Sequence, residues 1–324
     1  YTGRTSSPLG MMKSQTVGKI GLVGPGAVGG YYGAMLALSG EEVNFLFRST
    51  YDVVKEKGLW LVHHAEGGRR EPVEGVHVHS SSDSIGVCDW VIVATKATAN
   101  HALNDLISPL VGDHTRLLTL QNGMGNVENL SHSFGQDRTI LAGLCFTCIN
   151  RTAPNIIESL LPGYVQFGEF GQPLSDEGRI MVQSFCSAGV RVRESESLDE
   201  ALWRKLCWNV PFNGIAIAGG GITTDVILAD PVLRIRARNL MLEIQAGARA
   251  CGIFIEDSFL DRQFELTEPM GSYKPSSLID FLAGKPVEID AIWLEALRRG
   301  EAKGVEMPEL RKLGEELVET LGRI

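Results

Sequence analysis

Lys19-Ile20-Gly21-Leu22-Val23-Gly24-Pro25-Gly26-Ala27-Val28-Gly29 opens the ordered pattern of this chain, where a short apolar strand meets a glycine-rich turn. An apolar segment with helical character follows at residues 30–40, and a second apolar strand is expected at residues 42–47. A G-x-G-x-x-G turn inside a strand–turn–helix–strand unit of about 30 residues is typical of dinucleotide binding. We therefore predict an α/β nucleotide-binding fold that begins at Lys19.

Each glycine of this turn is expected for a different structural reason. Gly24 permits the tight turn, Gly26 lets the backbone approach a pyrophosphate, and Gly29 lets the helix pack closely on the strand. The start of the helix offers free N–H groups and the positive end of its dipole to phosphate oxygens. The residues predicted to hold the cofactor phosphates are Gly24, Pro25, Gly26, Ala27, Val28 and Gly29.

The residues after the second strand bear on which cofactor binds. NAD-binding folds usually carry an acidic residue there, which holds the ribose 2′-OH. This chain has Arg48-Ser49-Thr50 instead. Guanidinium and hydroxyl groups bind a 2′-phosphate well, whereas a carboxylate would repel it. We therefore expect NADP(H), held in part by Arg48; the alternative is that Arg48 is an ordinary surface residue.

Further strands are predicted at residues 89–95 and 116–120, and the pattern from 139 to about 192 is rich in strand signals. The first two strands end at Lys96 and at Gln121-Asn122-Gly123. Ligands of such sheets lie beyond the carboxyl ends of the strands. Lys96 and Asn122 are therefore candidates for contacts with cofactor or substrate, although Asn122-Gly123 is also typical of a tight turn.

The second half of the chain has helical periodicity. Helices are expected at residues 199–218, 230–251, 276–282, 287–303 and 308–321. The change of pattern near residues 194–197 divides the chain into a nucleotide-binding domain at 19–196 and an all-helical domain at 197–324. Residues 1–18 are expected to be a polar leader left over from expression, outside the fold.

Three polar residues lie on one face of the first of these helices. Lys205, Asn209 and Asn213 are spaced at i, i+4 and i+8, so they project in one direction from an otherwise apolar helix. A cation and two amides are costly to bury without a polar partner, and a bound substrate is one such partner. The alternative for Lys205 alone is a lysine whose ammonium reaches solvent past the helix.

Composition excludes several classes of protein. The chain has 324 residues, 44% of them apolar, and a formal net charge of −9, which argues against a nucleic-acid partner. No apolar run reaches the roughly 18 residues of a membrane span. The six cysteines are scattered, which favours reduced thiols in the cytoplasm. Cys145 and Cys148 form a C-x-x-C inside a predicted strand and are interpreted as interior thiols, and no cysteine–histidine group has the spacing of a metal site.

The chain resembles the ketopantoate reductase family from Lys19 nearly to its end. The most specific segments are Gln121-Asn122-Gly123-Met124-Gly125, the helix with Lys205, Pro275-Ser276-Ser277-Leu278-Ile279-Asp280, and Gly284-Lys285-Pro286-Val287-Glu288-Ile289-Asp290. The resemblance implies an N-terminal Rossmann domain and a helical C-terminal domain similar to that of 6-phosphogluconate dehydrogenase. It places the active site in the cleft between them.

The resemblance also implies roles for individual residues. Lys205 matches the catalytic lysine, which donates the proton. Glu288 matches a glutamate of the catalytic site beside the cofactor and the reacting centre, where it either orients Lys205 or holds a ribose hydroxyl. The implied substrate ligands are Lys205, Asn209, Asn213, Ser276 and Asn122. The implied cofactor contacts, besides the glycine turn and Arg48, are Lys96, Asn122, the backbone near Ile149, and Glu288.

The implied activity is the NADPH-dependent reduction of 2-dehydropantoate to (R)-pantoate, a step toward pantothenate and coenzyme A. Two departures leave alternatives open. Residues 219–225 lack an asparagine common in the family, so Thr223 replaces it or the contact is absent, and residues 145–148 replace a more polar segment. A sibling reductase of another 2-keto acid and a non-enzymatic NADPH sensor are the alternatives. A homodimer is a further expectation.

Overall fold

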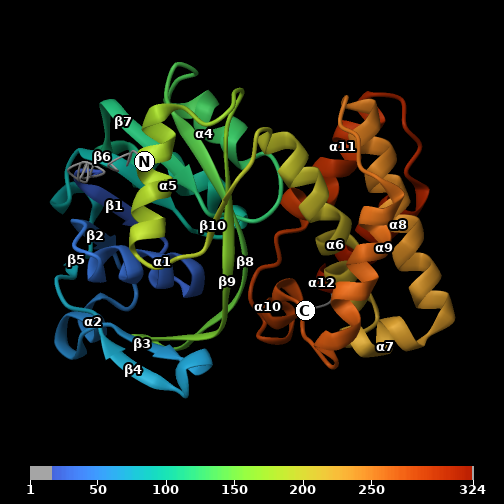
Figure 1. Ribbon diagram of the computed structural model, residues 1–324, viewed down its shortest axis with the longest axis horizontal. Helices are drawn as coiled ribbons and strands as arrows, with labels where there is room; N and C mark the ends of the chain where they lie inside the picture. The colour runs from blue at the N-terminus through green and yellow to red at the C-terminus, as the bar shows by residue number, and fades with distance from the viewer. Residues whose placement is uncertain (1–16, 323–324) are drawn as a thin grey trace, which may run out of the picture.

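The computed structural model describes residues 17–322, and it has an α/β part and a helical part that lie side by side (Figure 1). The expected fold class is therefore confirmed. Most of the expected leader, residues 1–16, lies outside the described residues. Its last two positions do not, and Val17 is buried in the apolar core of the α/β part.

The described strands form one ten-stranded mixed sheet in the order β4-β3-β9-β8-β7-β6-β1-β2-β5, with β10 paired to β9. They are β1 (Ile20–Val23), β2 (Val43–Leu46), β3 (Trp60–His63), β4 (Arg69–Pro72), β5 (His77–His79), β6 (Cys88–Val93), β7 (Val111–Thr119), β8 (Ile140–Ala153), β9 (Ile156–Glu169) and β10 (Val192–Glu194).

The run β5-β2-β1-β6-β7-β8 is parallel throughout. It has the strand order of the dinucleotide-binding fold, in which the direction of winding reverses between the first and fourth strands. Here these strands are β1 and β6. Ligands bind in the crevice at that reversal, so the topology places the turn at residues 24–29 and the end of β6 at the mouth of a binding site.

Helices cover both faces of this sheet (Figure 1). One core lies under α1 and α5, and the other lies under α3 and α4. The helices of this part are α1 (Ala27–Leu38), α2 (Tyr51–Lys57), α3 (Leu103–Ile107), α4 (Asn126–Phe134) and α5 (Asp176–Ser187). The expectation of strands from 139 to about 192 is wrong over α5. This segment has an amphipathic helical pattern, and the Ser175 hydroxyl caps the helix by accepting a hydrogen bond from the Gly178 N–H.

The helical part begins where the periodicity changes. The hydroxyl of Ser197 accepts a hydrogen bond from the N–H of Glu200 and caps α6. The helices are α6 (Leu198–Ala218), α7 (Thr224–Ala229), α8 (Pro231–Ala250), α9 (Asp257–Thr267), α10 (Ser276–Leu282), α11 (Glu295–Ala302) and α12 (Pro308–Gly322). The sequence reading missed α9, and the helix expected from residue 287 begins only at a π-helical turn, Asp290–Leu294.

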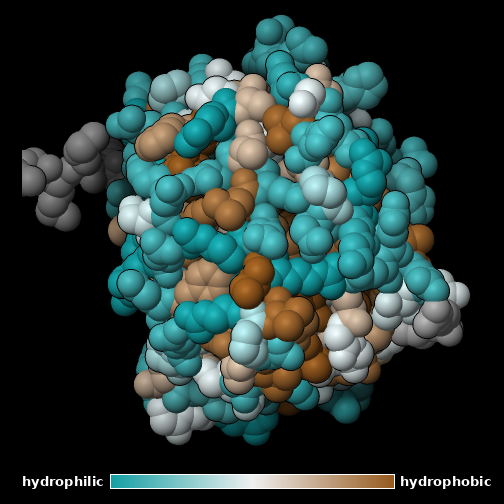
Figure 2. Space-filling view, turned by 90° about the vertical axis from the view of Figure 1, so that its right-hand side faces the viewer, coloured by the Kyte–Doolittle hydropathy of each residue, from teal (hydrophilic) through white to brown (hydrophobic). Residues whose placement is uncertain are grey.

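Apolar packing continues from the sheet into the helical part. One buried cluster includes Leu144 of β8 together with Leu198, Leu202 and Trp203 of α6. At the outer side, Figure 2 shows apolar side chains gathered on the lower half of the face of the helical part. Exposed apolar residues of α8 are Val232, Ile235 and Leu242. Within residues 17–322, no helix combines the length and apolar character that a membrane crossing requires.

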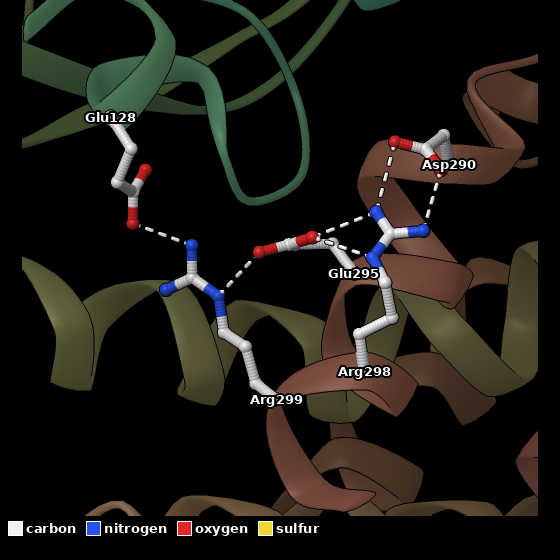
Figure 3. Close-up of polar contacts among 5 residues, drawn as sticks. All are labelled: Glu128, Asp290, Glu295, Arg298 and Arg299. Atoms are coloured by element: carbon white, nitrogen blue, oxygen red, sulfur yellow. Dashed lines mark hydrogen bonds and ion pairs between the residues drawn. The ribbon is translucent and has the colours of Figure 1, made fainter. Parts of the chain in front are cut away.

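Ionic contacts also link the two parts (Figure 3). The guanidinium of Arg299 in α11 donates to Glu128 in α4 at 2.5 Å and to Glu295 at 2.8 Å. Glu295 in turn accepts from Arg298, which is also paired with Asp290. The Arg299–Glu128 contact therefore joins an α/β-domain helix to a helix of the helical domain.

Candidate active site

A groove of about 370 Å³ runs over the carboxyl ends of the parallel strands. The glycine turn, the turn after β2, and the ends of β6 and β7 line it, and Glu288 reaches it from the helical part. Eight of the predicted cofactor residues lie on its wall together with Glu288: Gly24, Pro25, Gly26, Ala27, Val28, Arg48, Lys96 and Asn122. Distant segments of the sequence therefore meet at the place expected for a dinucleotide.

The glycine turn fits a dinucleotide phosphate. Gly24 has φ +82°, and a Cβ there would lie 2.4 Å from the Thr95 nitrogen. At Gly26 a Cβ would meet nothing closer than 3.9 Å, so this position is open toward a ligand. A Cβ at Gly29 would lie 2.5 Å from the Ala94 side chain, so only glycine fits there, and Gly29 itself does not line the groove. The first turn of α1 has no acidic residue and no side-chain cap, which leaves its N–H groups for an anion.

Basic and hydroxyl side chains gather at the β2 end of the groove. Arg48, Ser49 and Thr50 line it, and Arg48 is exposed. Arg151 of β8 joins them and donates a hydrogen bond of 2.7 Å to the Thr50 hydroxyl. The sequence reading missed Arg151, because its position in the chain gives no sign that it approaches the glycine turn. This end of the groove therefore fits a phosphate on the adenosine ribose.

Lys96 lies at the opposite end and contacts the helical part. Its ammonium is 2.5 Å from a carboxylate oxygen of Asp280 in α10 and 3.7 Å from one of Glu288. Burial alone would lower the pKa of Lys96, but the carboxylates of Glu288 and Asp280 together raise it. Asp280 was not assigned a role from the sequence. The available signal was its position four residues after Ser276, which places both side chains on one face of a helix.

Glu288 is a buried carboxylate, 4% exposed. One of its oxygens accepts a 2.9 Å hydrogen bond from the backbone N–H of Ala97, directly after Lys96. Burial raises the pKa of Glu288 above the usual range, and the nearby ammonium of Lys96 opposes that rise. The carboxylate thus ties the segment before α11 to the end of β6, at the wall of the groove.

Lys205 reaches from α6 toward the turn that follows β7. Its Nζ donates to Asn122 Oδ1 at 3.0 Å and to the carbonyl of Cys145 at 3.1 Å, and it lies 5.1 Å from the centre of the Phe146 ring. Burial lowers the pKa of Lys205, while Cys145 and Glu288 act in the opposite direction. A half-buried lysine with two acceptors is held in one place and releases its proton more readily than a surface lysine.

The Asn122 turn is fixed by a backbone contact between the two parts. Met124 N–H donates to the carbonyl of Ala291 at 2.8 Å. Gly123, at φ +85°, passes so close that a Cβ would lie 2.3 Å from the same carbonyl oxygen. The glycine is therefore required both by its left-handed backbone and by this close approach. The contact sets the position of the Asn122 amide against Lys205.

The two asparagines of α6 have different surroundings. Both functional atoms of Asn213 are engaged: Nδ2 donates to the Asn209 carbonyl at 3.1 Å, and Oδ1 accepts from the Ser277 N–H at 2.9 Å. With 1% exposure it holds the start of α10 rather than presenting a free amide. The side chain of Asn209 makes no hydrogen bond within the part of the chain that is described. Ser276 is exposed at the start of α10.

The remaining expected residues lie outside the groove wall. Ile149 is buried in β8, and the groove-lining residue of this strand is Arg151, two positions further on. The hydroxyl of Thr223 donates to Asp225, which also accepts from Ser272 at 2.6 Å. The C-x-x-C lies inside β8, as expected, but Cys145 and Cys148 are half-buried rather than interior thiols. Burial raises the pKa of Cys145 to about 11. Among residues 17–322 no group of three histidines, cysteines or acids is placed to hold a metal ion.

Comparison with known families agrees with this arrangement. A family model described as ketopantoate reductase PanE/ApbA matches residues 20–172, and one described as the C-terminal part of ketopantoate reductase PanE/ApbA matches residues 197–319. The chain is 34% identical over 304 residues to the 2-dehydropantoate 2-reductase of Nostoc sp., with 92% of this chain and 94% of the relative covered.

Solved structures show the same architecture. The 2-dehydropantoate 2-reductase from Geobacter metallireducens has a TM-score of 0.88 and 39% identity, with 93% of this chain and 99% of that chain covered. A D-mandelate dehydrogenase solved with NADH and anilino(oxo)acetate has a TM-score of 0.85, covering 94% of this chain and 99% of that one. Its identity is 20%, so that likeness concerns the fold alone.

Proposed function

We propose that this chain, which belongs to the ketopantoate reductase family, reduces 2-dehydropantoate to (R)-pantoate with NADPH, a step toward pantothenate and coenzyme A. The observation that carries the proposal is the meeting of Lys205 and Asn122 beside the groove. A proton donor from the helical domain and a groove suited to a dinucleotide from the α/β domain make the two halves of a keto-acid reductase.

Lys205 has the chemistry that ketone reduction requires. Bound NADPH would supply the hydride to C2 of the keto acid. Negative charge then develops on the ketone oxygen, which the Lys205 ammonium stabilises and protonates to give the hydroxyl. The bonds to Asn122 Oδ1 and to the Cys145 carbonyl orient the ammonium before substrate arrives. Its lowered pKa makes the proton easier to transfer.

The other polar residues would bind the substrate or hold the site together. The Asn209 amide and the Ser276 hydroxyl are donors with no internal role that competes with a substrate carboxylate. Asn213 would act one step away by fixing α10, which carries Ser276 and Asp280. Glu288 would keep Ala97 and Lys96 in place at the groove wall.

NADP(H) is the proposed cofactor because Arg48, Ser49 and Thr50 occupy the turn that reads the ribose. A second candidate is reduction of a related 2-keto acid. It is favoured by Cys145, whose carbonyl accepts a hydrogen bond from Lys205, in a segment that the family resemblance implies should be more polar. An NADPH sensor without turnover has less support, since Lys205 is poised as a proton donor. A homodimer and a cytoplasmic location stay predictions.

The decisive assay follows NADPH oxidation with 2-dehydropantoate, beside a panel of other 2-keto acids and beside NADH. We expect turnover with 2-dehydropantoate and NADPH, and a fall in kcat of about 10²–10⁴-fold in Lys205→Ala with NADPH binding retained. Lys312→Ala, which removes an exposed lysine from α12, serves as the matched control and should keep wild-type rates.

Other results would change the assignment. Preference for another acid by a wide margin would favour the sibling reductase. Cofactor binding without turnover on any acid would favour the sensor. Wild-type kcat/KM in Lys205→Ala would show that another group donates the proton.

A further inference from the structure

Arg151 is a basic residue in the cofactor groove to which neither the sequence nor the chemistry above gives a role. It lies near the end of β8, next to the hairpin that leads into β9. This hairpin passes over the start of α1, where the Ile157 side chain lies against Gly30. The tertiary structure thereby carries an arginine to the glycine turn across 126 positions of sequence.

The guanidinium of Arg151 joins the two turns that hold a dinucleotide. Nη1 donates to the Pro25 carbonyl at 3.2 Å, and Nη2 donates to the Thr50 hydroxyl at 2.7 Å and to the Pro154 carbonyl. The group also lies over the Phe47 ring, 5.7 Å from its centre. These contacts use three of the five N–H donors of an arginine, so two remain for a ligand.

The charge of Arg151 is not neutralised by its surroundings. Its hydrogen-bond partners are two carbonyls and a hydroxyl, and burial by itself lowers its pKa. Among residues 17–322 no carboxylate contributes to that pKa. A half-buried guanidinium is costly to hold without a counter-ion. In a groove that ends at Arg48, Ser49 and Thr50, an anion is the missing partner.

We propose that Arg151 is a specificity residue for the cofactor, which binds the 2′-phosphate of NADP(H) together with Arg48. This inference rests on the proposed NADPH dependence and deepens it. Arg151 contacts Thr50 at 2.7 Å, more closely than Pro25, and Thr50 lies in the turn expected to contact the adenosine ribose. The pyrophosphate is expected at the first turn of α1 instead. Two guanidinium groups suit a phosphate that carries close to two negative charges.

The test compares dissociation constants for NADPH and NADH, measured by nicotinamide fluorescence in the absence of a keto acid. Loss of a charge-assisted contact costs about 1.5–3 kcal/mol, so Arg151→Gln should weaken NADPH binding by roughly 10–100-fold. NADH binding should change by less than about threefold. Arg151→Lys keeps the charge but loses the planar fork, and its loss should be intermediate. Arg48→Gln should show the same selectivity.

Arg138→Gln is the matched control. Like Arg151, Arg138 donates to uncharged partners, here the carbonyls of Gly112, Thr115 and Phe134, but it lies outside the groove. Its loss should lower the unfolding temperature without changing the ratio of NADPH to NADH affinity. An equal loss of both cofactors in Arg151→Gln and Arg151→Lys would overturn the inference, because a structural or pyrophosphate role predicts that result.

The outcome is separable from the proposed function. A protein that prefers NADPH but ignores 2-dehydropantoate would still test Arg151 by binding. A wild-type protein that binds NADPH and NADH equally would instead refute the proposed preference for NADPH itself.

Discussion

Lys205 combines two properties that oppose one another, partial burial and a positive charge. The cost of burial is offset by Asn122 Oδ1, by the Cys145 carbonyl and by the face of the Phe146 ring. None of these partners is a carboxylate in direct contact. The ammonium is therefore stabilised enough to stay in place but not enough to hold its proton as firmly as an ion-paired lysine would.

A pH dependence follows from this environment. Burial lowers the pKa of Lys205 below its ordinary value of 10.5, and the proton donor must be charged. We expect kcat/KM to be constant below that pKa and to fall as the pH rises through it, earlier than for an exposed lysine. A pH–rate profile measures this limb. In Lys205→Arg the limb should vanish or move to higher pH, and an unchanged limb would assign it to another group.

At the scale of elements, β1, the glycine turn and the first turn of α1 form the unit that we predict to bind the cofactor phosphates. Gly24 and Gly29 are needed for the fold itself, since a Cβ at either would collide with the end of β6 or with the turn. Gly26 differs, because its surroundings leave room for a Cβ and only a ligand would meet it. The same motif thus contains two positions that the fold requires and one, Gly26, for which we predict a role in binding.

Gly26→Ala should separate these two requirements. We expect an unfolding temperature close to wild type, with NADPH and NADH binding weakened to a similar degree, by at least about tenfold or ~1.4 kcal/mol. Gly24→Ala should instead lower the unfolding temperature, because of its positive φ and the contact with Thr95. Calorimetry and cofactor titration give both readouts. Undiminished cofactor affinity in Gly26→Ala would place the pyrophosphate elsewhere.

At the scale of the whole molecule, the site exists only while the two domains keep their relative position. The connections between them include the Lys96–Asp280 pair, the backbone bond from Met124 to Ala291, and the Glu128–Arg299 pair of Figure 3. Arg299 is 22% exposed and also binds Glu295, so it belongs to a network rather than to an isolated surface pair. Networks of partly buried charges couple more strongly than exposed pairs.

A double-mutant cycle tests that coupling. With Glu128→Gln and Arg299→Gln, unfolding free energies should give an interaction energy of about 0.5–3 kcal/mol, reduced at high salt. The exposed pair Arg262–Glu265 within α9 is the matched control, and its coupling should be about 0.5 kcal/mol or less. Equal values for both pairs would mean that the Glu128–Arg299 contact does not hold the domains together.

The sequence by itself determined the local elements and the type of chemistry. The spacing of Gly24, Gly26 and Gly29 predicted the phosphate turn, because each of these positions in a strand–turn–helix unit requires a residue without a side chain. The spacing of Lys205 and Asn209 marked a polar face on an apolar helix. Two helices were not predicted from the sequence. The segment of α5 was read as strand because it lies among strong apolar strands, and α9 was missed because a short amphipathic helix gives a weak signal.

Only the tertiary structure decided which of these residues meet. It brought Arg151 to Pro25 and Thr50, and it set Asp280 on Lys96, because strand order and domain packing join segments far apart in the chain. It also turned Asn213 inward to hold α10, which its helical spacing alone did not distinguish from Asn209. Periodicity fixes the direction of a side chain relative to its own element, whereas its partners depend on how the elements pack.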